Sequence, residues 1–142
     1  MTEVLTTADK ASDEPSAAGH VSAFLRDQDR DRWLTTLFAP APVRTALQSL
    51  YAFNAEIARV RELVSDPLPG EMRYQWWRDV LAGHGRGDVA SHPVAAALLE
   101  TIARYRLPAS AFDHLIEART FDLYDDPMPT VGDLEGYCGE TS

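Results

Sequence analysis

The chain has 142 residues, of which 45% are hydrophobic and 25% charged, proportions that suit one soluble globular domain. Thirteen basic residues against twenty-two acidic ones leave a formal net charge of -9, which argues against a nucleic-acid partner because phosphates would be repelled. A single cysteine, Cys138, excludes an internal disulfide, and no apolar run approaches the roughly 20 residues that would span a bilayer.

The N-terminal segment differs in composition from the rest of the chain. Residues 1–19 are rich in Thr, Ala, Ser, Asp and Glu, which predicts a disordered tail. The segment has no apolar leader pattern, so we expect neither a secretory nor a transit peptide, and a cytoplasmic location. Residues 20–142 are expected to form the helical domain. Their apolar spacing is that of helices interrupted by proline, which predicts an all-α fold.

Proline and capping signals delimit six expected helices, at about residues 21–39, 42–64, 69–82, 91–106, 108–124 and 130–142. The first of these would break near Asp29. Ser91 is the expected N-cap of the fourth helix, with Pro93 in its first turn. Thr130 is the expected N-cap of the sixth, where Asp133 completes a capping box. That last helix meets no stop signal, so we expect the chain to be the N-terminal part of a larger helical protein.

Polar residues interrupt the apolar face of the second expected helix. Asn54 and Arg61 fall within its apolar arc, and Ala58 and Glu62 lie along the flank of that arc. A buried amide or guanidinium without a partner is costly. These residues therefore indicate either a polar cavity between helices that faces an anionic ligand, or side chains that neighbours and solvent satisfy locally.

The fifth expected helix repeats this pattern. Arg119 lies in its apolar arc, and Asp122 follows at a spacing that allows an intrahelical pair. The pair is either a structural ion pair at the edge of the core or an arginine held for a diphosphate or a partner's carboxylate. Asp122, Asp125 and Asp126 are weak candidates for binding Mg²⁺, since acids beside Pro127 more often form a solvated helix end.

Five segments match the pattern of a known family in the same order: SLYAFN at 49–54, WWRD at 76–79, SHPVAAAL at 91–98, FDL at 121–123 and DLEGYC at 133–138. Together they resemble the squalene/phytoene synthase family over about residues 29–142. The resemblance implies the N-terminal half of an isoprenoid-synthase-type helical bundle. Members of that family condense two prenyl diphosphates head to head in a central cavity, with Mg²⁺ held by two aspartate-rich motifs.

The first aspartate-rich motif of that family is altered in this chain. Aligned without gaps, its two adjacent aspartates fall on Ala58 and Arg59, and its last aspartate falls on Glu62. A methyl group and a guanidinium cannot replace the oxygen ligands that Mg²⁺ requires. Arg59 and Arg61 could instead contact a diphosphate directly. The second motif would lie beyond residue 142.

A closer resemblance joins YAFNAEIA at 51–58, MRYQWW at 72–77 and EAR at 117–119 to the non-catalytic branch of the family. That branch includes a mitochondrial complex I assembly factor and bacterial relatives, and the lack of a transit peptide favours a bacterial protein. The resemblance implies a catalytically degenerate protein without a cofactor or catalytic residues. It would bind a protein partner, a prenyl lipid or both, and peripheral membrane contact is compatible with this role. Its candidate ligand or diphosphate residues are Asn54, Arg59, Arg61, Glu62, Arg119 and Asp122.

Two other functions stay open from the sequence. The chain could belong to an active prenyl transferase of isoprenoid or carotenoid biosynthesis. Its diphosphate site would then use Arg59, Arg61 and Glu62, with Mg²⁺ held by Glu62 and by Asp122, Asp125 or Asp126. Alternatively, it could be a helical interaction module with no ligand at all.

Overall fold

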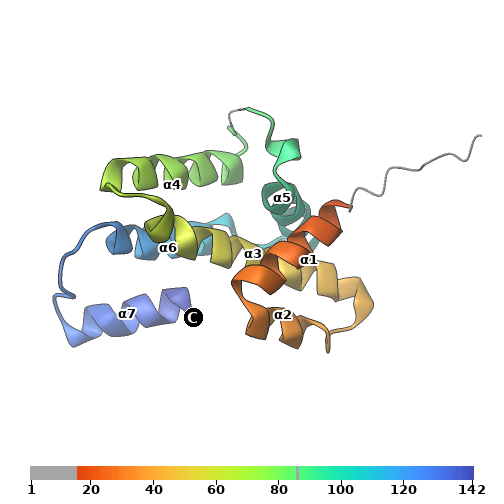
Figure 1. Ribbon diagram of the computed structural model, residues 1–142, viewed down its shortest axis with the longest axis horizontal. Coiled ribbons are helices and arrows are strands. Elements are labelled where there is room, and N and C mark those ends of the chain that lie inside the picture. The colour runs from red at the N-terminus through yellow and green to blue at the C-terminus, as the bar shows by residue number, and fades with distance from the viewer. Residues whose placement is uncertain (1–15, 86) are drawn as a thin grey trace, which may run out of the picture.

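The computed structural model describes residues 16–85 and 87–142, and every regular element in that part is helical, which confirms the all-α expectation. The α-helices are α1 (Ala17–Gln28), α2 (Arg30–Thr36), α3 (Ala41–Leu63), α4 (Pro67–Leu81), α5 (Pro93–Tyr105), α6 (Ala109–Thr120) and α7 (Val131–Thr141). Two short 3-10 turns, η1 (Val89–Ser91) and η2 (Phe121–Leu123), lie before α5 and after α6 (Figure 1).

The predicted break near Asp29 is confirmed. Its backbone N–H donates to the Leu25 carbonyl at 2.7 Å and closes α1, while its side chain accepts from the Arg32 N–H at 3.1 Å and opens α2. The start of α1 differs from the prediction. The helix begins at Ala17, inside the segment 1–19 that was expected to be a disordered tail, because the Ser16 hydroxyl caps it. Residues 1–15 lie outside the described part of the chain.

Side-chain caps mark the starts of α5 and α7. The predicted Thr130 cap of α7 is confirmed, with the Asp133 N–H donating to the Thr130 hydroxyl at 3.0 Å. The predicted Ser91 cap is wrong. Ser91 donates to the Asp88 carbonyl within η1, and the Nδ1 atom of His92 accepts from the Ala95 N–H at 3.2 Å. The 3-10 turn η1 moves the cap of α5 from Ser91 to His92. Helix α4 also differs, because it begins at Pro67, two residues earlier than predicted.

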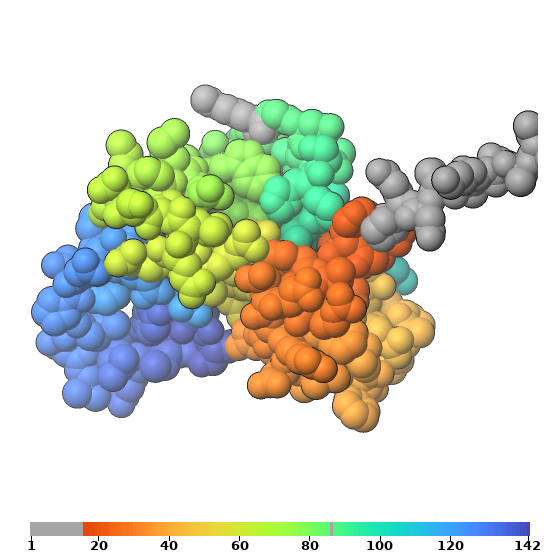
Figure 2. All heavy atoms as spheres, in the orientation of Figure 1, coloured from red at the N-terminus to blue at the C-terminus, as the bar shows by residue number. Residues whose placement is uncertain are grey.

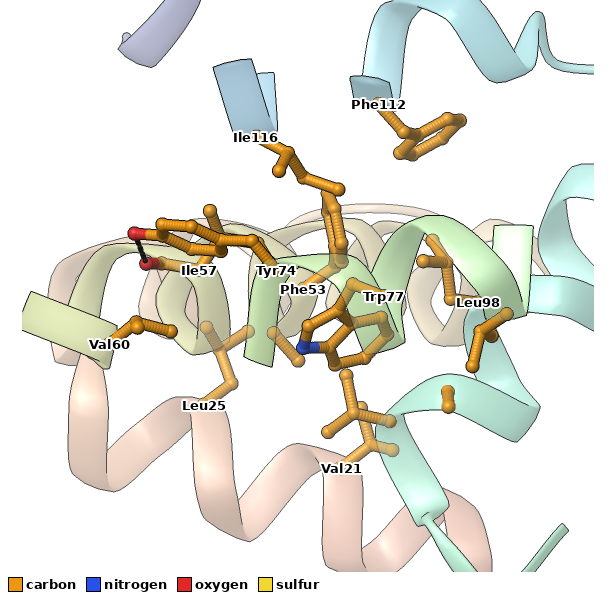
Figure 3. Close-up of a cluster of buried hydrophobic side chains, with 14 of the residues drawn as sticks. Val21, Leu25, Phe53, Ile57, Val60, Tyr74, Trp77, Leu98, Phe112 and Ile116 are labelled. Atoms are coloured by element: carbon orange, nitrogen blue, oxygen red, sulfur yellow. Dashed lines mark hydrogen bonds between the residues drawn. The ribbon is translucent and has the colours of Figure 1, made fainter. Parts of the chain in front are cut away.

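The core forms around α3, which contacts α1, α2, α4, α5 and α6 (Figure 1). Apolar residues at helical spacing on α3 face inward, including Phe53, Ile57 and Val60. Phe53 lies at the centre, with its ring edge-on to Trp77 at 5.1 Å and to Phe112 at 5.5 Å between centroids (Figure 3). These contacts place α4 and α6 against one side of α3.

The C-terminal helix is held more loosely than the others. Its main neighbour is α6, and none of its residues is buried. A hollow of about 510 Å³ lies between α6 and α7, lined by Phe121, Met128 and Tyr137 among others (Figure 2). Among the described helices, none combines the length and the apolar character required to cross a membrane.

Candidate functional site

A polar pocket of about 250 Å³ lies where α1, α2, α3 and α6 meet. It gathers four of the six side chains that the sequence analysis named as ligand candidates, namely Asn54, Arg59, Glu62 and Arg119. Its remaining lining residues are Gln28, Asp29, Arg32, Ala55 and Ala58. Segments separated by about sixty residues in the chain therefore build one site.

Helix geometry explains the contribution of α3 to this pocket. Asn54, Ala58 and Glu62 are four residues apart, and Arg59 lies beside them, so they share one strip of the helix next to its buried face. Arg61 does not belong to this strip. Its side chain is 43% exposed and pairs with Asp125 at 3.1 Å, outside the pocket. Of the two alternatives left open by the sequence, Arg61 therefore follows the one in which a neighbour and solvent satisfy the side chain, whereas Asn54 lines the pocket.

Buried polar atoms without partners concentrate at this pocket. In the described part of the chain, four buried side-chain nitrogen or oxygen atoms have no hydrogen-bond partner, and three of them are Asn54 Oδ1, Arg59 Nε and Arg119 Nε. Leaving such an atom unsatisfied costs about 1–3 kcal/mol. Three of the four belong to residues that line this pocket, where water or a bound polar group can satisfy them.

The charges of the pocket are unevenly paired. Arg32 pairs with Asp29 at 3.5 Å, and Arg119 pairs with Asp122 at 3.2 Å. Arg59 makes no ion pair with any described residue; its guanidinium carbon lies 5.2 Å from the centroid of the Phe24 ring. Glu62 is exposed and likewise unpaired among the described residues. One arginine is thus available for a negatively charged ligand, with one carboxylate at the rim.

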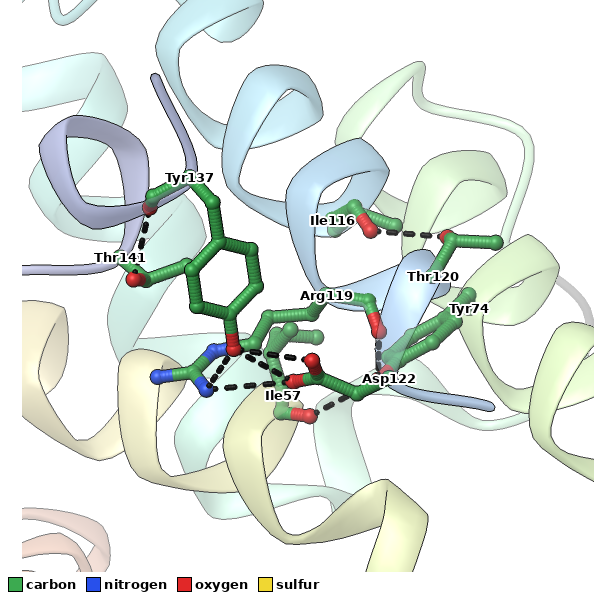
Figure 4. Close-up of polar contacts among 8 residues, drawn as sticks. All are labelled: Ile57, Tyr74, Ile116, Arg119, Thr120, Asp122, Tyr137 and Thr141. Atoms are coloured by element: carbon green, nitrogen blue, oxygen red, sulfur yellow. Dashed lines mark hydrogen bonds and ion pairs between the residues drawn. The ribbon is translucent and has the colours of Figure 1, made fainter. Parts of the chain in front are cut away.

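Hydrogen bonds to Asp122 and Tyr137 hold the Arg119 guanidinium in place (Figure 4). Its Nη1 atom donates to Asp122 Oδ2 at 3.2 Å and to the Tyr137 hydroxyl at 3.0 Å, and that hydroxyl donates to the Asp122 carboxylate at 2.8 Å. The predicted Arg119–Asp122 pair is confirmed. Tyr137 was not predicted, because nothing local in the sequence shows that α7 returns to α6 at this point.

A second tyrosine joins the backbone of α3 to that of α6. The buried Tyr74 hydroxyl lies 3.1 Å from the Ile57 carbonyl and 3.3 Å from the Arg119 carbonyl (Figure 4). Burial, with a smaller contribution from the nearby Asp122 carboxylate, raises the pKa of Tyr74 to about 12. Burial also raises the pKa of Tyr137.

These raised pKa values predict a loss of stability in alkaline solution. In the unfolded chain a tyrosine loses its proton near pH 10, whereas Tyr74 keeps its proton in the folded protein to about pH 12. The unfolded state therefore binds fewer protons in this window, and the free energy of unfolding falls as pH rises through it. Urea unfolding at about pH 9 and about pH 11 measures the loss. A Tyr74→Phe variant should lose less, and an equal loss would contradict this assignment.

Comparison with known proteins identifies the family of this chain. The squalene/phytoene synthase family model matches residues 25–142. The chain belongs to the squalene/phytoene synthase family. It is 31% identical over 118 residues to rat NADH dehydrogenase (ubiquinone) complex I, assembly factor 6, which covers 83% of this chain and 35% of that protein. The human protein of that name is 30% identical over 118 residues, again 83% of this chain and 35% of that protein.

A biosynthetic enzyme is similar to nearly the same degree. The 15-cis-phytoene synthase of Synechococcus elongatus is 30% identical over 113 residues, which covers 75% of this chain and 34% of the enzyme. The chain spans about a third of the length of these relatives. Overall identity therefore does not distinguish the two kinds of relative, and the residues of the site carry the distinction.

The donor set of the pocket does not fit the Mg²⁺ ions that the family uses. Ala58 and Arg59 line the pocket at the aligned positions of the adjacent aspartates, and neither supplies an oxygen. Within residues 16–85 and 87–142, no three His, Cys, Asp or Glu side chains gather as a metal site. Asp122 is engaged by Arg119 and Tyr137, Asp125 pairs with Arg61, and Asp126 is exposed.

Proposed function

We propose that this member of the squalene/phytoene synthase family acts by binding, in an assembly role for respiratory complex I, and does not transfer prenyl groups. Its partners would be a protein, a prenyl lipid or both, and no cofactor is required. The similarity to complex I assembly factor 6 of rat and human supports the assembly role. A cytoplasmic location in a bacterium and a peripheral membrane contact are part of the same proposal.

The chemistry of Arg59 carries this proposal. In the family, paired carboxylates attract Mg²⁺ ions that draw the diphosphate away from the prenyl carbon. Here a guanidinium without an ion pair lines the pocket at that position, and its positive charge repels a divalent cation. The adjacent Ala58 contributes only a methyl group. Loss of the leaving group then has no electrostatic assistance from a metal ion at this site.

The similarity to 15-cis-phytoene synthase supports a second candidate, an active prenyl transferase. This function would need Glu62 and the Asp122, Asp125 and Asp126 carboxylates to hold Mg²⁺ together. Two of these carboxylates are already paired with arginines, and of the four only Glu62, on α3, lines the pocket. Catalysis would therefore require a rearrangement of α6 and α7.

A diphosphate-release assay separates these two functions. The purified full-length protein, incubated with farnesyl or geranylgeranyl diphosphate and Mg²⁺, is expected to release no diphosphate above the uncatalysed rate. The Synechococcus elongatus 15-cis-phytoene synthase is the positive control. Release that depends on Mg²⁺ and disappears in a Glu62→Ala variant would overturn the binding proposal.

The assembly role needs its own measurement. In the native host, the tagged protein is expected to co-purify with subunits of complex I, and deletion of its gene should lower the amount of assembled complex. Unchanged complex I in the deletion strain would contradict this role, whatever the outcome of the enzyme assay.

A further inference from the structure

We propose that the turn between α2 and α3, together with the C-terminal end of α5, is the surface with which this protein contacts a membrane of anionic lipids. This inference rests on the peripheral membrane contact that forms part of the proposed function. It adds the face of the molecule that makes the contact and the charge of the lipid that this face prefers.

The turn exposes three large apolar side chains, which we call the apolar turn. Leu34 and Leu37 are 42% and 40% exposed, and Phe38 is 91% exposed. Transfer of such side chains from water into an apolar medium is favourable, and a patch of them on a surface indicates a contact site. Figure 1 shows α2 and the start of α3 at the lower right edge of the molecule, away from α4. The apolar turn therefore lies at an outer edge of the described structure.

The backbone of the apolar turn is already hydrogen-bonded within the protein. The N–H groups of Leu37, Phe38 and Ala39 donate to carbonyls three residues before them at 3.1, 3.2 and 3.1 Å. The Nη2 atom of Arg44 donates to the carbonyls of Leu37 and Ala39 at 3.2 Å each. Unpaired backbone groups are costly in the apolar part of a bilayer. These bonds allow the apolar turn to meet lipid with those groups satisfied.

Arginines at the end of α5 lie beside the start of α3. Arg104 and Tyr105 line a small cavity together with Pro42 and Thr45, which begin α3 just after the apolar turn. Arg106 follows as the C-terminal cap of α5 and is exposed. Neither arginine makes an ion pair with a described residue. Their charges are therefore available to lipid headgroups.

The local charge is opposite in sign to that of the whole chain. Residues 32–55 and 101–112 contain four arginines and no acidic residue, whereas the chain has a net charge of -9. Glu100, which also lines the cavity, is the acid next to the second segment. Each arginine near an anionic membrane surface strengthens binding, because the surface potential is negative. Charge complementarity thus points to anionic lipid as the partner.

The other exposed apolar groups do not have this charge. Val131 and Leu134 on α7 are exposed, but that helix contains three acidic residues and no basic one. Leu68 and Met72 on α4 are each 66% exposed, and residues 66–73 contain two acidic residues and one arginine. Anionic lipid would repel the first group and would not attract the second. Charge therefore favours the apolar turn over these two groups.

The experiment is co-sedimentation of the full-length protein with vesicles of phosphatidylglycerol and phosphatidylcholine, compared with vesicles of phosphatidylcholine alone. We expect binding to the anionic vesicles, weaker at high salt because salt screens the arginines. Phe38→Ser is expected to weaken this binding about tenfold or more, since the ring can no longer enter the lipid. Leu68→Ser is the matched control, because it removes an exposed apolar side chain from α4 and should leave binding unchanged.

A second pair of variants tests the charge. Arg104→Gln is expected to weaken binding to the anionic vesicles about fivefold. Arg73→Gln is its control, because Arg73 is also exposed and makes no ion pair with a described residue, but lies on α4. Circular dichroism confirms that each variant is folded. In a Phe38→Trp variant, brominated lipid should quench fluorescence beyond the quenching in the unaltered protein, which reports contact of residue 38 with acyl chains.

The possible failures are distinguishable. Absence of vesicle binding, equally tight binding to neutral vesicles, or equal loss in the Phe38 and Leu68 variants overturns this inference and leaves the assembly role intact. Unchanged vesicle binding with loss of complex I subunits in Phe38→Ser would make the apolar turn a protein interface, which also overturns the inference. Release of diphosphate from a prenyl substrate overturns the proposed function, whatever the vesicles show.

Discussion

Replacing Phe53 with alanine is expected to lower the free energy of unfolding by about 3–5 kcal/mol, the cost of removing a large aromatic side chain from a packed core. Phe53 is 1% exposed and contacts both Trp77 and Phe112 edge-on. Its loss would open a cavity where α3, α4 and α6 meet, and it would remove two aromatic pairs in addition to the buried area.

Urea unfolding monitored by circular dichroism measures this effect. Phe38 provides the matched control, because the same residue type is 91% exposed after α2 and its replacement should change stability by less than about 0.5 kcal/mol. Equal destabilisation by the two substitutions would contradict the position of the core described above.

Replacing Asp122 with alanine is expected to release α7 from the body of the protein. The carboxylate accepts from Arg119 and from Tyr137, and α7 has no buried residue to hold it otherwise. Hydrogen bonds to charged groups contribute about 1.5–3 kcal/mol each. Backbone amides of α7 should therefore exchange with solvent at least about tenfold faster, while the amides of α3 change little.

Hydrogen–deuterium exchange read by mass spectrometry resolves the two helices. Asp125→Ala is the control, since the Asp125 side chain is 92% exposed and its ion pair among the described residues is with Arg61 at the surface. If α7 exchanges no faster in the Asp122 variant, the contact between Phe121 and Tyr137 suffices to hold the helix. Faster exchange throughout the protein would instead show that Asp122 supports the whole fold.

The proposed function depends on two side chains of the pocket and not on overall similarity. Identity to an assembly factor and to a synthase is nearly equal, at 31% and 30%. In the proposed function, Ala58 and Arg59 replace metal ligands without disturbing α3, because both residue types are compatible with a helix. Conservation of helical packing therefore carries little information about catalysis.

Local signals in the sequence predicted most of the helices. Prolines mark the starts of α4 and α5, the Asp29 side chain separates α1 from α2, and Thr130 caps α7. These features depend on residues within one turn of each other, so the sequence contains the whole interaction. Three helix starts differ from the prediction: α1 begins earlier because Ser16 caps it, α4 begins at Pro67 instead of Pro69, and His92 caps α5 in place of Ser91.

The sequence by itself determined the helical class and the family, and it shows that positions 58 and 59 carry Ala and Arg, because each depends on residue type and local order. Only the tertiary structure decided that Asn54, Arg59 and Arg119 share a pocket, that Arg61 faces outward, and that Tyr137 holds Arg119. The physical reason is that these contacts join helices far apart in the chain. Their meeting depends on how the apolar face of α3 packs, and the rotation of a helix about its axis is not encoded within any one of its turns.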